Sequence, residues 1–274
     1  MNVVRQVLTK IRTKGGGRVV DGLRSAMQEV AIAGLHQKGF FRRAAFSGGS
    51  CLRIVHGSPR FSDTLEFCWL EPDEDLLLEP LFRALRTEFA SFGLDIVITL
   101  KKRMPRIGSE TGTLKKNARC FVLSVPGEET LNITFEIDLL SYPGFSTEEK
   151  RLPEPFPFQI RCVSLPDLFA ATMHHLLFGN SNSFINGPDW FDFEWFIKNS
   201  VPLNLPHVAR IAGLHSVDRL SDREFQLKLA HRIDSLDVTL ARSSVNRSID
   251  DLDLLNRWSR HYFHELAHYL IISV

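Results

Sequence analysis

The segment Ala45–Phe67, AFSGGSCLRIVHGSPRFSDTLEF, constrains the fold of this 274-residue chain more than any other. Gly48, Gly49 and Ser50 come first, an apolar segment follows, and acidic residues then alternate with apolar ones. A glycine pair before a helix lets an anion approach the backbone, and the helix N-terminus adds amide donors. We interpret the segment as a phosphate-binding turn, a helix and a carboxylate-bearing strand. The turn alone is weak evidence, because any tight strand-to-helix connection can use glycine.

A second acidic strand strengthens this interpretation. The alternating pattern of residues 132–139 places Thr134, Glu136 and Asp138 on one face and apolar residues on the other. Nucleotidyl transfer with two divalent cations requires clustered carboxylate oxygens. Two carboxylates on one strand face, together with the glycine turn, therefore predict a metal site.

The totals place the chain among ordinary soluble proteins. Its net charge is +1, with 44% hydrophobic and 24% charged residues, so the whole-chain charge gives no argument for nucleic-acid or membrane binding. The four cysteines are scattered without a C-x-x-C pair, which favours a reducing cytoplasm over a disulfide framework. No apolar stretch approaches the roughly 20 residues needed to span a bilayer, and the N-terminus lacks a signal-peptide core. We expect a cytoplasmic protein that does not bind membranes.

Hydrophobic periodicity predicts an α/β fold with a helical C-terminal half. Besides the opening segment, we expect helices over 3–11, 21–37 and 75–92, and strands over 94–100, 120–125 and 132–139. The lysine- and arginine-rich segment 101–116 is interpreted as a solvated surface loop. The proline-rich segment 153–157 separates an α/β domain, 1–158, from a helical domain, 159–274. In the second domain we expect helices over 165–178 and 188–197, and from about residues 205, 222 and 250.

The motifs of this chain resemble a known family. The matching segments, in chain order, are AFSGGSCLRIVHG, PRFSDTLEF, ITFEIDL, LPDLFAATMHHLL, GPDWFDFEWF and RWSRHYF. Together they resemble the AbiEii/AbiGii toxin family of nucleotidyltransferases, within the DNA polymerase β-like superfamily. The resemblance implies a nucleotidyltransferase-like mixed sheet with flanking helices and a helical C-terminal domain. It also implies a toxin of a bacterial type IV toxin–antitoxin or phage-defence (abortive infection) system, with Mg²⁺ as cofactor, NTP as substrate, an RNA such as tRNA as acceptor and a cognate antitoxin.

The resemblance also assigns site residues. Three acidic residues take the catalytic positions: Glu66, Glu136 and Asp189. The expected metal ligands are Glu66, Glu136 and Asp138. The expected nucleotide-binding residues are Gly48, Gly49, Ser50, Arg53 and Arg60.

Four positions depart from the family pattern. Thr64 and Glu66 take the two aspartate positions of the first acidic strand, so one metal ligand is lost. Thr134 and Thr172 replace lysines, and Pro188 replaces an arginine. A threonine cannot neutralise nucleotide phosphates. Two alternatives follow: a working but divergent transferase, or a catalytically degenerate protein that acts by binding an antitoxin, another protein or RNA.

The segment His264–His268 matches H-E-x-x-H, the helix motif of zinc peptidases. His261 lies on the same helix face, but only six residues follow His268, too few for the usual downstream ligand. A zinc peptidase is therefore a minor alternative. We favour histidines on a partly exposed helix face.

Overall fold

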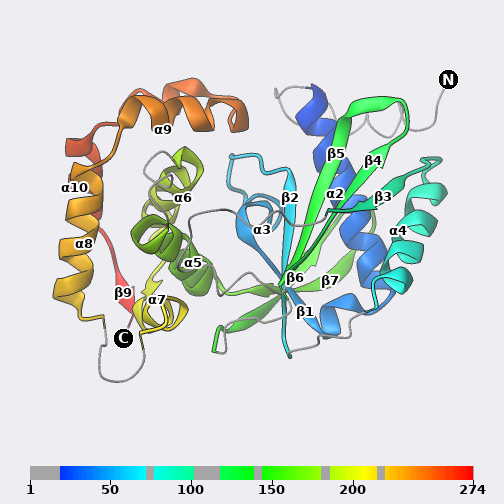
Figure 1. Cartoon of the computed structure of the whole chain (residues 1–274), viewed down its shortest axis with the longest axis horizontal. Coiled ribbons are helices and arrows are strands. Elements are labelled where there is room, and N and C mark those ends of the chain that lie inside the picture. The colour runs from blue at the N-terminus through cyan, green and yellow to red at the C-terminus, as the bar shows by residue number, and fades with distance from the viewer. Residues whose placement is uncertain are drawn as a thin grey trace.

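The computed structural model describes residues 19–71, 77–101, 118–138, 144–179, 186–214 and 220–273. Figure 1 shows two halves side by side, a mixed sheet with its helices and a group of C-terminal helices. The expected helix over 3–11 and nearly all of the basic segment 101–116 lie outside the described residues.

A seven-stranded mixed sheet in the order β3-β4-β5-β2-β1-β7-β6 forms the first half. Its strands are β1 (Ala44–Ser47), β2 (Thr64–Trp69), β3 (Val97–Leu100), β4 (Ala118–Val125), β5 (Glu128–Asp138), β6 (Thr147–Leu152) and β7 (Phe158–Val163). β2 runs antiparallel to β1 and parallel to β5, so the two predicted acidic strands are neighbours. The predicted α/β class with a mixed sheet is confirmed.

One face of the sheet is apolar and carries a row of stacked phenylalanines. Ring centroids lie 5.4 Å apart for Phe46 and Phe67, 6.4 Å for Phe67 and Phe135, and 4.5 Å for Phe135 and Phe121. All four side chains are buried, in a core shared with helices α2 (Val19–Gln37) and α4 (Glu79–Ser91). Because side chains alternate along a strand, burying these rings turns the acidic residues of β2 and β5 to the opposite face.

The strands β6 and β7 were not predicted. They form an antiparallel pair on either side of the proline-rich segment 153–157. β6, with the sequence TEEKRL, lies at the sheet edge, where charged side chains are favoured and the apolar alternation that marks a strand is weak. The expected domain boundary after residue 158 thus falls within β7. We place the end of the sheet half at Val163, and the division into two domains stays a prediction.

Helices form most of the second half (Figure 1). They are α5 (Leu165–Phe178), α6 (Gly187–Lys198), α7 (Leu205–Ile211), α8 (Asp222–Asp234), α9 (Val238–Val245) and α10 (Arg260–Ala267). Short 3₁₀ segments cover Phe40–Arg42, Asn246–Ser248 and Leu252–Leu255, and the short strands β8 (Leu203–Asn204) and β9 (Ile272–Ser273) pair in parallel. The helix α9 was not predicted, and the helix expected from about residue 250 begins only at Arg260. Within the described ranges, no helix combines the length and apolar character needed to cross a membrane.

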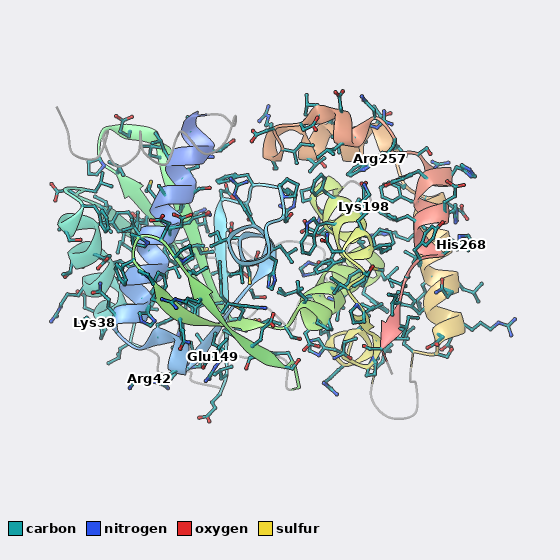
Figure 2. All side chains as sticks on the ribbon, turned by 180° about the vertical axis from the view of Figure 1, so that it is seen from behind. Lys38, Arg42, Glu149, Lys198, Arg257 and His268 are labelled. Atoms are coloured by element: carbon teal, nitrogen blue, oxygen red, sulfur yellow. The ribbon has the colours of Figure 1, made fainter. Side chains whose placement is uncertain are left out.

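Glu194 of α6 anchors the C-terminal segment. Its carboxylate accepts hydrogen bonds from Trp258 Nε1 at 2.6 Å and from the Tyr262 hydroxyl at 2.7 Å. Lys198 and Arg257 form ion pairs with it, and Figure 2 shows both on the helical half. The buried carboxylate therefore ties the RWSRHYF segment to α6, the helix that also carries the acidic site residues.

Gly187 permits the contact between α6 and α9, which gives a test of this packing. A methyl group at Gly187 would lie 2.0 Å from the Ala241 carbonyl oxygen, so we expect Gly187→Ala to lower the free energy of unfolding by more than about 2 kcal/mol. Gly22, in α2, has no atom within 4 Å of the same position, and Gly22→Ala serves as the control. It should raise stability by up to about 1 kcal/mol. Urea denaturation of both variants measures this, and equal effects would contradict the packing argument.

Candidate active site

The acidic face of the sheet brings two predicted catalytic residues together. Glu66 of β2 and Glu136 of β5 are register partners on adjacent parallel strands, and both are half-buried. Neighbouring strands lie about 4.8 Å apart, so the two carboxylates share one region of the face. Asp138 lies on the same face, two residues beyond Glu136, and its register partner is Cys68. Thr64 and Thr134 form the register pair on the other side of the glutamates.

The glycine turn lies directly beside Glu66. Ser47, the last residue of β1, is the register partner of Glu66, and the helix α3 (Gly48–His56) begins at the next residue. Gly48 has a φ of 72°, a conformation that disfavours side chains. A methyl group there would lie 2.4 Å from Glu66 Oε1 and 2.5 Å from its Cδ. Gly48 thus gives the Glu66 carboxylate room against the turn.

Arg60 fills the space beside the second glycine and joins the two halves of the molecule. A methyl group at Gly49 would lie 2.3 Å from Arg60 Nη2. The guanidinium donates from Nε to Asp192 Oδ1 at 2.8 Å and from Nη2 to Oδ2 at 2.5 Å. Burial alone would lower the pKa of Arg60, but the Asp192 carboxylate offsets this and raises it. Because Asp192 belongs to α6, the pair brings that helix to the glycine turn.

Asp189 lies one turn before Asp192 on α6 and completes the acidic group. The Asn186 side chain donates to its Oδ2. Burial, followed by the negative charge of Asp192, raises the pKa of Asp189 to about 7; Glu66 adds to the increase and Arg60 opposes it. The electrostatic influence of Glu66 and Arg60 places Asp189 near the acidic face of the sheet. The structure therefore brings together predicted residues from both halves.

Sequence reasoning missed a second buried cation, Arg232 of α8. Its Nε donates to the Leu176 carbonyl at the end of α5. Burial lowers the pKa of Arg232, and Asp189 counteracts this. Arg232 lies in the last turn of a largely polar helix, where an arginine is ordinarily exposed. The sequence therefore held no signal that this side chain is buried near Asp189.

Ser50 and Arg53 occupy the helix that follows the turn. The Ser50 hydroxyl is fully buried and donates to the Thr64 carbonyl at 2.6 Å, so it ties α3 to β2. Only its backbone amide remains a candidate for phosphate. The Arg53 guanidinium lies 5.3 Å from the centre of the Phe61 ring and donates to the Pro59 carbonyl. Its assignment as a nucleotide-binding residue stays a prediction.

Two of the positions that depart from the family pattern, Thr172 and Pro188, lie where their surroundings suit an uncharged residue. Thr172 is buried, and its hydroxyl donates to the Leu168 carbonyl within α5. Pro188 occupies the first turn of α6, where a missing amide is tolerated. The nearby positive charges that act on Asp189 are instead the buried Arg60 and Arg232.

The donor set at the sheet face suits Mg²⁺. Within the described part of the chain, no group of three or more His, Cys, Asp or Glu side chains is arranged to hold a metal ion. Mg²⁺ in nucleotide-dependent sites, however, commonly takes one or two carboxylates, with substrate phosphates and water completing the shell. The register pair Glu66 and Glu136 meets that requirement. The assignment of Glu66, Glu136 and Asp138 as metal ligands stays a prediction.

The histidines of the H-E-x-x-H segment contact other protein groups. His264 Nε2 lies 2.8 Å from Asp234 Oδ1, and His268 Nδ1 lies 2.8 Å from the His264 carbonyl oxygen. His261 pairs with Glu265, the residue that a peptidase would use to activate water. These contacts agree with histidines on a partly exposed helix surface, and nothing in them favours a zinc site.

Two solved structures share the fold of this chain. A candidate nucleotidyltransferase from Helicobacter pylori superposes with a TM-score of 0.51 at 13% identity, covering 89% of this chain and 92% of its own. JHP933 from Helicobacter pylori gives 0.51 at 13% identity, with 88% of each chain covered. MenT4, a nucleotidyltransferase toxin from Mycobacterium tuberculosis, gives 0.47 at 14% identity, covering 97% and 99%.

The family is established by sequence. Residues 31–264 match the model of the nucleotidyl transferase AbiEii toxin of type IV toxin–antitoxin systems. The chain therefore belongs to the AbiEii nucleotidyltransferase toxin family, and the predicted resemblance is confirmed. No curated protein matches it. The family implies an NTP substrate, usually a divalent metal, and an antitoxin partner.

The ion pair between Arg60 and Asp192 should contribute strongly to stability. Asp192→Asn leaves a buried guanidinium without its carboxylate, so we expect a loss of about 3 kcal/mol in the free energy of unfolding. The exposed pair of Arg86 and Glu79 provides the control, and Glu79→Gln should change stability by less than about 0.5 kcal/mol. A double-mutant cycle with Arg60→Gln measures the coupling. Additive effects of the two single substitutions would show that the pair does not join the halves.

The raised pKa of Asp189 predicts a pH dependence of stability. The folded chain holds this proton up to about pH 7, whereas an unfolded aspartate releases it near pH ~4. Folding thus takes up a proton in this window, and the stability contributed by Asp189 falls as the pH rises from about 4 to 7. Asp189→Asn removes the effect, so its stability relative to wild type should rise by about 2–4 kcal/mol between pH 4 and 8. Melting curves across this range, with the exposed Asp63→Asn as control, measure it; parallel profiles for wild type and Asp189→Asn would contradict the raised pKa.

Proposed function

We propose that this chain is a toxin that transfers a nucleoside monophosphate from an NTP to an RNA acceptor such as tRNA, with Mg²⁺. The observation that carries the proposal is the register pairing of Glu66 with Glu136 beside the Gly48 turn, with Asp189 brought to the same region by α6. Family membership supports the reaction class. The proposal includes a cytoplasmic location and a part in phage defence by abortive infection.

Each residue of the site would have its own role in the reaction. Glu66 and Glu136 would hold Mg²⁺, which supplies charge stabilisation for the phosphates when bound. The turn amides of Gly49 and Ser50 would receive phosphate oxygens at the N-terminus of α3. Asp189, with a pKa of about 7, suits a general base that takes the proton from the attacking hydroxyl of the RNA. The hydroxyl oxygen then bonds to the α-phosphorus, and pyrophosphate leaves.

Label transfer tests the proposal. Purified protein incubated with Mg²⁺, total tRNA and each NTP labelled in turn on the α-phosphate should label the RNA. Glu136→Gln removes a metal-binding carboxylate and should reduce the rate about 100-fold or more. Glu265→Gln, in the H-E-x-x-H segment, should leave the rate unchanged. Absence of label with all four nucleotides would refute the transferase activity, and an equal loss in Glu265→Gln would show that the effect of Glu136→Gln is not specific to the proposed site.

The second candidate is a catalytically degenerate protein that binds an antitoxin, another protein or RNA through the same region. The observation that favours it is the loss of cations: Thr172 is buried and bonded to its own helix, and Arg60 is bound by Asp192. Calorimetry separates the two candidates. The transferase should release or absorb heat on mixing with NTP and Mg²⁺, whereas the degenerate protein should show no nucleotide binding.

A further inference from the structure

The carboxylate of Glu66 lies against the glycine turn. A methyl group at Gly48 would lie 2.4 Å from Oε1, 2.5 Å from Cδ and 3.0 Å from Oε2 of Glu66. The whole carboxylate group therefore lies against the first residue of α3. The carboxylate therefore occupies the side of the turn that the absent side chain of Gly48 leaves open.

The start of α3 attracts anions. The preceding Ser47 makes no side-chain hydrogen bond to the first turn of the helix, so the helix lacks its usual capping oxygen. The amides of the first turn carry a partial positive charge, and the Arg60 guanidinium lies against Gly49, the next residue. Glu66 also acts electrostatically on Arg60. A negative charge placed here is stabilised, whether it belongs to Glu66 or to a nucleotide.

We propose that Glu66 is an intramolecular competitor of the nucleotide: its carboxylate must leave the turn before the phosphates of an NTP can approach the helix N-terminus. This inference rests on the proposed function, because it concerns the same nucleotide site. A protein whose binding-competent conformation is only partly populated shows a weakened apparent affinity. Glu66 is the register partner of Glu136, so a divalent cation bound by the two carboxylates would compete with the turn for Glu66 and would favour nucleotide binding.

Shortening the side chain tests the competition while keeping its charge. Glu66→Asp withdraws the carboxylate by one methylene, so we expect the Kd of ATP measured by calorimetry in EDTA to fall about fivefold. Glu149→Asp makes the same chemical change at an exposed position of the edge strand β6, which β7 separates from β1 (Figure 2 labels Glu149), and should leave the Kd unchanged. Melting curves confirm that each variant is folded. Glu66→Gln keeps the length of the side chain and removes its charge, and it should also bind ATP more tightly in EDTA. This variant replaces Glu66→Asp in the test if Glu66→Asp does not fold.

The outcomes separate this inference from the proposed function. Suppose that wild type binds ATP with Mg²⁺, but that Glu66→Asp, or Glu66→Gln in its place, binds ATP in EDTA no more tightly than wild type does. The competition is then refuted and the nucleotide site stands. If wild type binds none of ATP, GTP, CTP and UTP in Mg²⁺, the proposed function is refuted and this inference with it.

Discussion

The buried ion pair between Arg60 and Asp192 is the contact on which the site depends. It joins the loop after α3 to α6, the helix that carries Asp189, and both of its side chains are at least 90% buried, with exposed fractions of 9% and 5%. A buried charge is tolerated only when it is paired and hydrogen-bonded, which this fork-shaped geometry achieves. The pair thus fixes the distance between the acidic face of the sheet and the acidic turn of α6.

The pair also explains why the carboxylates of the site differ. Arg60 directs two of its hydrogen bonds to Asp192. Asp189, one turn away, has no such bond from Arg60; desolvation and the negative charges of Asp192 and Glu66 raise its pKa, and Arg60 opposes the increase. Carboxylates whose surroundings push their pKa values apart take different chemical roles. Here the paired carboxylates of Glu66 and Glu136 suit a cation, whereas Asp189, with its raised pKa, suits a proton.

The acidic faces, the glycine turn and most of the helices followed from local patterns in the sequence. Alternation with a period of two places Glu136 and Asp138 on one face without any knowledge of neighbours. The pairing of β2 with β5 is a long-range contact that no local pattern encodes; the family resemblance assigned Glu66 and Glu136 to one metal site but did not predict the pairing. β6 was missed because a charged edge strand lacks apolar alternation, and Arg232 was missed because burial of an arginine depends on which helix packs above it.

The balance of charge in this site argues that nucleotide and cation bind together. Glu66 and Glu136 are neighbours on the sheet face, and Asp189 and Asp192 lie one turn apart on α6, whereas the described cations that act on Asp189 are Arg60 and Arg232. Arg60 is already paired with Asp192, so less of its positive charge is left for the phosphates of a nucleotide. A divalent cation held by Glu66 and Glu136 would supply further positive charge. The lysines absent at Thr134 and Thr172 thus need not abolish nucleotide binding, but they make it depend on the metal more strongly than in a site that keeps its own cations.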